Sequence, residues 1–165
     1  MTKHAKLSGL LLLAFLLSPF IFAQETIDRV LVLKSEHKLL LLSGTETVKS
    51  YAVALGSGGP EPKWRQGDHK TPEGFYRIDW RNPHSRFHLG LHISYPNEGD
   101  RERARKLGVS PGGDILIHGL GTEFKWLGVK HRLYDWTDGC IAVTDSEIEE
   151  IWRLVRDGTI VEIRH

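Results

Sequence analysis

The sequence predicts one β-dominated domain with two helices over residues 27 to 165. Short apolar runs bounded by turn residues recur along the chain, a pattern that is typical of strands. Only two segments carry helix signals, one at 100–107 and one that begins at Thr144. The chain of 165 residues contains no repeat, low-complexity tract or linker, and its length suits one domain plus a targeting segment.

The first half of this domain is predicted to be β structure. The apolar runs 30–33 and 38–42 indicate a hairpin, and a strand over 46–55 follows it. Residues 56–70 form a long loop rich in Gly and Pro. Its glycines resemble a phosphate-binding loop, but the Lys-Ser/Thr pair and the helix start that such a loop needs are missing. The turn chemistry of residues 71–74 then introduces a strand over 75–80.

The middle of the chain alternates between strand and helix signals. Residues 91–95 are rich in β-forming side chains. The short charged segment 100–107 predicts a helix that ends at Gly108. Residues 114–117 then form a buried-type strand that ends at His118.

The clearest helix signal lies near the end of the chain. Thr144 and Glu147 fit a capping box, which places a helix start there. An apolar stripe with helical spacing follows, made of Ile148, Ile151, Trp152 and Val155. Gly158 ends this helix, and residues 159–163 predict a closing strand.

Three histidines recur at every fourth position, His84, His88 and His92, which invites a metal-site interpretation. Pro83, Gly90 and the β-rich residues 91–95 argue against one helix through all three. In an extended strand the outer two would lie roughly 26 Å apart, too far to share an ion. We therefore expect structural or substrate-facing histidines, no bound metal and no cofactor.

Residues 1–23 are expected to be a secretory signal peptide. Lys3 and Lys6 precede the apolar run 7–17, and Ala23 is a small residue at a cleavage position. The alternative is an uncleaved membrane anchor, because residues 20–22 extend the apolar stretch toward ~20 residues. Under either reading we expect the domain to be exported to the periplasm or cell envelope.

Charge and composition narrow the class of partner. Cleavage after Ala23 would remove two of the 22 Lys and Arg residues and none of the 21 Asp and Glu residues, leaving a net charge of −1. Such a balance argues against a nucleic-acid partner, which normally meets a basic stripe. With 40% hydrophobic and 26% charged residues, the chain is globular in composition.

Cys140 is the one cysteine in the sequence, so no intrachain disulfide is possible. In an exported protein, an unpaired cysteine indicates intermolecular pairing or a thiol retained for its reactivity. The alternative is a packed cysteine acting as a small hydrophobic residue. Composition alone leaves both interpretations open.

The neighbours of Cys140 favour a nucleophile. Gly139 allows a sharp turn that presents backbone amides as an oxyanion hole, and the Thr137 hydroxyl is suited to fixing that turn. A nucleophilic thiol needs a base, and His118 at a strand end is the candidate. Gly119, the next residue, permits close approach of a ligand or unusual backbone angles. A structural histidine and a packed thiol remain the alternatives.

The pattern His118-Gly119, a variable loop and then Thr137-Asp138-Gly139-Cys140 resembles the signature of the YkuD-type L,D-transpeptidases. Further blocks resemble the family in order: 67–68, 71–75, 93–97, 111–114 and 136–143. The resemblance covers essentially the whole chain after the signal peptide.

The resemblance implies a β-sandwich-like catalytic domain that acts on peptidoglycan stem peptides. Cys140 would be the nucleophile and His118 the proton acceptor and donor, with the amides of Gly139 and Cys140 in the oxyanion hole. A backbone carbonyl, from Gly119 or near Thr137, would orient the imidazole.

We expect transfer of a tetrapeptide stem through a thioester to an amine acceptor, with release of D-Ala, in cell-wall cross-linking, remodelling or shape. Residues 120–136 would form a lid or wall over the stem, or an ordinary packed loop; Phe124 and His131 lie in it. The predicted substrate contacts are Trp136, Tyr134, Trp126 and Tyr95.

One position departs from the family pattern. Many members carry Arg two residues after the cysteine, where this sequence has Ala142. The form of residues 135–143 is closer to a subgroup that includes a hydrolase, which detaches an outer-membrane lipoprotein from peptidoglycan. A hydrolase of this kind is therefore the alternative function. A non-catalytic wall-binding module is the third candidate function. In that case Cys140 would react with a carbapenem no faster than a free thiol does.

Overall fold

The computed structural model describes residues 26–165, so the signal peptide predicted for residues 1–23 lies outside it. The prediction of a mainly β domain is confirmed, because the described chain forms eight strands and three α-helices. The strands follow one hydrogen-bonded order, β3-β2-β1-β8-β4-β5-β6-β7. Their bounds are β1 Arg29–Leu33, β2 Lys38–Ser43, β3 Glu46–Ala52, β4 Gly74–Ser85, β5 His88–Ile93, β6 Leu116–His118, β7 Ile141–Ala142 and β8 Ile160–Arg164.

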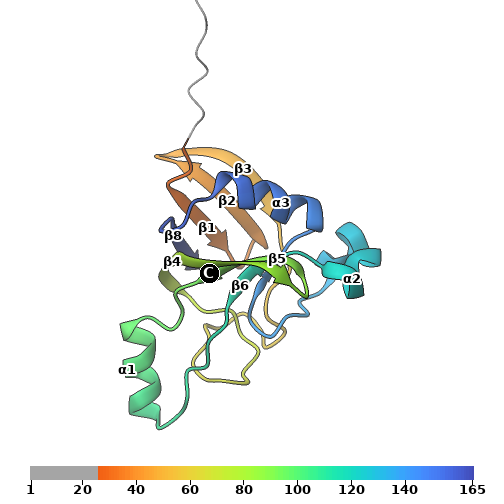
Figure 1. Ribbon diagram of the computed structural model, residues 1–165. Helices are drawn as coiled ribbons and strands as arrows, with labels where there is room; N and C mark the ends of the chain where they lie inside the picture. The colour runs from red at the N-terminus through yellow and green to blue at the C-terminus, as the bar shows by residue number, and fades with distance from the viewer. Residues whose placement is uncertain (1–25) are drawn as a thin grey trace, which may run out of the picture.

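The first and last segments of the domain form one half of the sheet. The predicted hairpin is β1 with β2, antiparallel, and β3 extends it on the outer side. The closing strand β8 runs parallel to β1 and joins this half to β4. Because β8 comes from the end of the chain, it closes the domain with long-range pairings (Figure 1).

Strand β4 belongs to both halves of the sheet, and it gives the fold its sandwich-like form. Its first residues, 74–77, pair with β8, and residues 78–85 pair with β5. Two register shifts interrupt the β4–β5 ladder, and such bulges bend a strand and increase its twist. The sequence predicted only residues 75–80 of this strand, because the bulged part lacks regular alternation.

Both predicted helices are present. Helix α1 spans Glu98–Leu107, begins at the cap Asn97 and ends at Gly108, which has a left-handed φ of 67°. Helix α3 spans Asp145–Leu154, and at its start the Thr144 amide donates to the Glu147 carboxylate over 2.8 Å, as the capping box predicts. A short helix α2, Gly121–Phe124, and a 3₁₀ segment η1, Lys125–Leu133, occupy the region predicted as a lid, wall or loop.

The core draws on both halves of the sheet and on one face of α3. Ile148, Ile151 and Val155 of the predicted stripe are almost fully buried, and Trp152 packs at the edge of the same cluster. In Figure 1, α3 lies across the strands while α1 projects away from them. Burial of one apolar stripe therefore fixes α3 on the sheet and leaves α1 on the outside.

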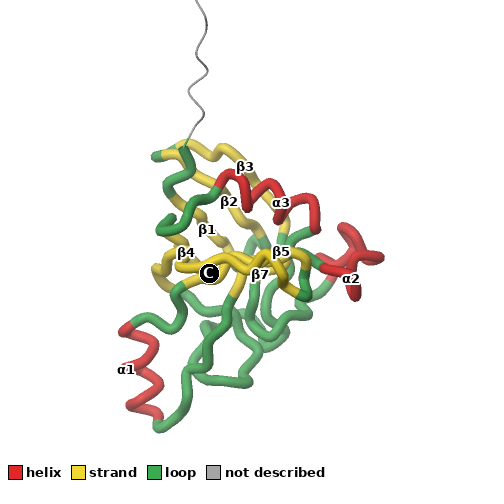
Figure 2. The backbone as a smooth tube through the Cα atoms, viewed as in Figure 1, coloured by secondary structure: helices red, strands yellow, loops and turns green. Residues whose placement is uncertain are grey.

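Long loops gather at one end of the domain, where Figure 2 draws them in green below the strands. The loop after β3 runs beside the segment between α1 and β6, and the Gln66 amide donates to the Ser110 carbonyl over 2.8 Å. The residues that lead to Cys140 also reach this end. Within residues 26–165, no helix is long and apolar enough to cross a membrane.

Candidate active site

The pairing of β6 with β7 brings His118 and Cys140 to the same part of the sheet. These strands are parallel, with Ile117 beside Ile141 and His118 beside Ala142. Ile117 and Ile141 are fully buried in the core, so alternate side chains turn to the other face. Cys140 comes one residue before this ladder. The same register extended by one residue puts it opposite Leu116, whose amide its sulfur contacts, and on the same face as His118, with Cα atoms about 8 Å apart on the diagonal from strand spacing and rise.

Cys140 keeps part of its surface accessible, and its sulfur touches two backbone groups. The Leu116 amide donates to Sγ over 3.5 Å, and Sγ lies 3.6 Å from the Asp114 carbonyl oxygen. Burial raises the pKa of the thiol to about 11, although the Leu116 hydrogen bond opposes the shift by stabilising a thiolate. The resting thiol is therefore protonated at neutral pH.

The turn before Cys140 depends on Gly139. This residue has a φ of 118°, and an added Cβ would lie 2.5 Å from the Lys70 carbonyl oxygen. The Thr137 hydroxyl accepts from the Gly139 amide over 3.2 Å and donates to the Cys140 carbonyl over 2.8 Å. One buried hydroxyl thus bridges both ends of the turn.

The two backbone amides predicted for the oxyanion hole, those of Gly139 and Cys140, differ in their hydrogen bonds. Since the Gly139 amide donates to Thr137, it is not free to donate to a ligand in this geometry. The Cys140 amide has no hydrogen-bond acceptor among the described residues. Of the two amides, that of Cys140 is therefore the one left free to donate, and Gly139 has a conformational role.

His118 is held by the residue that follows it. Its Nδ1 lies 2.6 Å from the Gly119 carbonyl oxygen. Because a carbonyl only accepts hydrogen bonds, Nδ1 carries the proton and Nε2 of the neutral ring is left as a base. Of the two sources predicted for an orienting carbonyl, the structure has Gly119.

The imidazole lies in an apolar setting. His118 is 2% exposed, and this burial lowers its pKa to about 4 despite the Gly119 hydrogen bond. The charge interactions with His131 and Arg86 lower it further. Since the thiol pKa is raised and the imidazole pKa is lowered, the resting pair is neutral and not a thiolate–imidazolium pair.

Gly119 is required by the packing of the protein's own chain. An added Cβ would lie 2.7 Å from the Asp145 carboxylate and 2.9 Å from both Ile148 and the Phe87 carbonyl. Its φ does not fall in the left-handed region. The close approach expected at this glycine is therefore made by α3 and by the β4–β5 turn.

Aromatic side chains enclose the imidazole. The ring of Phe87 stacks on His118 with centroids 4.3 Å apart, and Trp136 meets it edge-on at 5.9 Å. Phe124 packs against Trp136 at 4.7 Å, so α2 forms part of this wall. Phe87 was missed from sequence because it lies in a turn between strands, where no periodicity marks it.

The other predicted substrate contacts divide into two groups. Trp126 and Tyr134 are exposed, and they lie on or next to η1. Tyr95 is 3% exposed, and its hydroxyl donates to the Pro111 carbonyl over 2.8 Å. The structure therefore places Tyr95 in the core, where it supports the segment 108–115 and does not face an open surface.

Two of the three regularly spaced histidines have acidic partners. His88 lies 2.8 Å from the Glu149 carboxylate, and His92 lies 2.6 Å from the Asp79 carboxylate. His84 is exposed near the end of β4. Across residues 26–165 no group of three or more metal-ligating side chains is arranged to hold an ion.

Ala142, the position that departs from the family pattern, is completely buried. It lies beside His118 in register and exchanges backbone hydrogen bonds with Ala54 at 2.9 and 3.0 Å. An arginine side chain at this position would have no room without displacing its neighbours.

Comparison with known proteins shows the family to which the chain belongs. The family model described as the L,D-transpeptidase catalytic domain, YkuD, matches residues 27–163. YafK of Escherichia coli K12, which is provisionally named an L,D-transpeptidase, is 33% identical over 144 residues. That match covers 85% of this chain and 47% of YafK, so the chain spans about half the length of the curated relatives it matches.

Solved structures show the same fold. Pgp2 of Campylobacter jejuni, described as a helical cell shape determining protein, is 25% identical with a TM-score of 0.63, and the match covers 84% of this chain and 48% of Pgp2. An L,D-transpeptidase of Xylanimonas cellulosilytica is 16% identical with a TM-score of 0.56, with 86% of this chain and 62% of that chain covered. The second similarity concerns the fold alone.

Proposed function

The chain belongs to the YkuD family of L,D-transpeptidase catalytic domains, and on that premise we propose that it is an exported enzyme acting on peptidoglycan. Its substrate is a tetrapeptide stem, which acylates Cys140 and releases D-Ala. The observation that carries this proposal is the β6–β7 register, which sets Cys140 diagonally beside His118 on one face.

The first half of the reaction forms the thioester. Cys140 Sγ attacks the carbonyl carbon of the diamino acid that precedes D-Ala, and Nε2 of His118 takes the thiol proton. Because both groups are neutral at rest, proton transfer accompanies the attack and does not precede it. The Cys140 amide donates to the oxyanion of the tetrahedral intermediate. His118 then returns the proton to the D-Ala amine, which leaves.

The second half resolves the thioester. An acceptor amine gives up a proton to His118 and attacks the thioester carbonyl, which restores the thiol and completes a cross-link or attachment. Water in place of the amine gives hydrolysis by the same steps. The partial exposure of Cys140 is compatible with either nucleophile.

Hydrolysis, including release of a wall-bound lipoprotein, is the second candidate function. The form of residues 135–143, with Ala142 in place of the family's usual Arg, favours it because it resembles the subgroup that includes a hydrolase.

Incubation with purified muropeptides, and separately with lipoprotein-linked sacculi, distinguishes the two. Mass spectrometry of the products should show loss of D-Ala and joined peptides for a transpeptidase. Shortened stems or released lipoprotein without joined peptides would support the hydrolase. A Cys140→Ala variant that still converts either substrate would contradict the proposal.

A further inference from the structure

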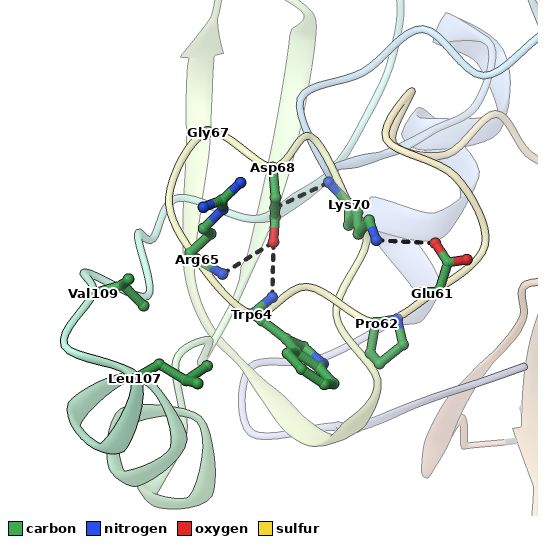
Figure 3. Close-up of a pocket in the computed structure, with 9 residues that line it drawn as sticks. All are labelled: Glu61, Pro62, Trp64, Arg65, Gly67, Asp68, Lys70, Leu107 and Val109. Carbon is green, nitrogen blue, oxygen red and sulfur yellow. Dashed lines mark hydrogen bonds and ion pairs between the residues drawn. The ribbon is translucent and has the colours of Figure 1, made fainter.

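A pocket of about 700 Å³ lies between the loop after β3 and the end of α1. Its lining is a mixture of apolar and charged side chains, drawn in Figure 3: Glu61, Pro62, Trp64, Arg65, Gly67, Asp68, Lys70, Leu107 and Val109. The candidate active-site residues do not line it. It therefore offers a surface that the acyl-transfer chemistry does not itself use.

The loop that carries this pocket is rigidly built around Asp68. The carboxylate accepts from the amides of Trp64 at 2.8 Å and Arg65 at 3.0 Å, and it pairs with Lys63 at 2.8 Å (Figure 3 draws the amide bonds). Burial opposes ionisation of Asp68, but these hydrogen bonds prevail and lower its pKa to about 2. The positions of Trp64 and Arg65 are thus fixed before any ligand arrives.

The side chains on this rigid loop are turned outward with little to contact. Trp64 is 51% exposed, and Leu107, on the α1 side of the pocket, is 52% exposed. Exposed large apolar side chains that line one hollow are typical of a ligand site. Their exposure indicates a ligand with an apolar part.

One cation that lines the pocket is left without a partner among the described residues. Lys70 is paired with Glu61 at 2.9 Å, as Figure 3 shows, and Lys63 is paired with Asp68. The Arg65 guanidinium has no ion-pair or hydrogen-bond partner among residues 26–165. An unpaired guanidinium is suited to a planar carboxylate.

The pocket and Cys140 are joined by shared backbone contacts. The Lys70 carbonyl lies against Gly139, the residue before the thiol. Gln66 of the same loop binds Ser110, and the segment that follows Ser110 carries Asp114, whose carbonyl touches Sγ. The backbone of residues 110–114 therefore links the loop of the pocket to the thiol.

We propose that this pocket is a subsite for a free carboxylate of the stem peptide, with Arg65 as its ligand and Trp64 and Leu107 as its apolar wall. This inference rests on the proposed function. Arg65 is a binding residue in it and takes no part in the transfer of the acyl group.

The test is a double-mutant cycle on binding. Protein carrying Cys140→Ala, which prevents turnover, is titrated by calorimetry with a disaccharide-tetrapeptide and with the same muropeptide after its carboxylates are amidated. Arg65→Gln should raise Kd on the order of tenfold for the free-carboxylate form, and amidation should raise it similarly. With Arg65→Gln, amidation should cause no further loss.

Two variants control the cycle. Arg156→Gln removes an exposed arginine near the end of α3 and should leave both affinities unchanged. Trp64→Ala should weaken both muropeptides equally, because the apolar wall does not contact the carboxylate. Thermal unfolding of Arg65→Gln should match that of the parent protein, since its side chain contacts no partner.

The subsite is contradicted if Arg65→Gln and Arg156→Gln bind the free-carboxylate muropeptide with the same Kd. It is also contradicted if amidation raises the Kd of Arg65→Gln as much as it raises the Kd of the protein that retains Arg65. Acylation of the protein that retains Cys140 tests the proposed function separately. Binding that depends on Arg65 without an acyl adduct would contradict the proposed function and support the subsite. An acyl adduct without Arg65-dependent binding would contradict the subsite alone.

Discussion

Nδ1 of His118 lies 2.6 Å from the carbonyl oxygen of Gly119, its own neighbour in the chain. This contact fixes the tautomer of the imidazole and leaves Nε2 as the basic nitrogen. The β6–β7 register places that ring diagonally beside Cys140. This arrangement predicts how Cys140 reactivity depends on pH and how the turn at Thr137 and the buried neighbours of the ring contribute to stability.

The pH dependence of Cys140 reactivity follows from the neutral resting pair. With the thiol pKa at about 11, alkylation by iodoacetamide should keep increasing from pH 7 toward pH 11. A thiolate–imidazolium pair would instead give a plateau that begins at the lowered pKa of the thiol, below neutral pH. Alkylation rates from pH 5 to 11 distinguish the two, and a plateau across neutral pH would contradict the neutral pair. Cys140→Ala provides the background rate.

The Thr137 hydroxyl should be essential to the turn. Thr137→Val keeps the shape but removes the bonds to the Gly139 amide and the Cys140 carbonyl, so we expect a loss of about 2–3 kcal/mol in unfolding free energy. Turnover should fall by at least about tenfold because the Cys140 amide is no longer held in place. Urea denaturation and a muropeptide assay measure both effects. Thr137→Ser is the matched control and should retain both bonds; equal behaviour of Val and Ser would contradict this role.

His131 should make the protein sensitive to acid. It is fully buried, neither of its ring nitrogens has a partner among the described residues, and burial lowers its pKa to about 4. Below its ordinary value of 6.5 the unfolded chain takes up a proton that the folded protein does not. Stability is therefore present above pH 6.5 and is lost as pH falls toward 4, at up to ~1.4 kcal/mol per pH unit from this residue.

His131→Leu should reduce this acid-side loss to the share that His118 contributes, because the pKa of His118 is also lowered to about 4. Stability at pH 7 should be unchanged or higher, because an unsatisfied imidazole is replaced by an apolar side chain. Urea denaturation at pH 4.5, 5.5 and 7 measures the slope. His84→Leu, at an exposed position, is the control and should follow the parent protein. A His131→Leu slope as steep as that of the parent would show that the burial of this ring does not govern acid stability.

Restoring the family's common arginine should be destructive here. Ala142→Arg places a charged side chain at a fully buried position beside His118, so we expect a loss of about 3 kcal/mol or more in unfolding free energy. Ala52→Arg, on the exposed side of β3, should change stability by no more than about 0.5 kcal/mol. Chemical denaturation compares the two. An Ala142→Arg variant that is stable and more active would contradict the inferred packing.

Local patterns in the sequence predicted the elements that depend on local forces. The capping box at Thr144 and the stripe beginning at Ile148 were sufficient for α3, because caps and periodic burial act within a few residues. The bulged end of β4 was not predicted, since bulges respond to pairing with β5 and not to their own sequence.

The candidate site was predicted less completely. His118 and Cys140 were identified as chemically suitable residues, but their shared face depends on a parallel pairing across more than twenty residues. No local signal shows that Thr137 occupies the Gly139 amide, or that Phe87 stacks on His118. Such features arise from tertiary packing, which brings distant segments together.

The central claim is that Cys140 carries the acyl group. Intact-mass spectrometry of the protein mixed with a tetrapeptide muropeptide tests it most directly. We expect a mass increase equal to the mass of the muropeptide minus the mass of the released D-Ala, mapped to the peptide that contains Cys140, with no increase for Cys140→Ala. Turnover with no adduct at Cys140 under rapid acid quenching, or an adduct that persists in Cys140→Ala, would contradict the account.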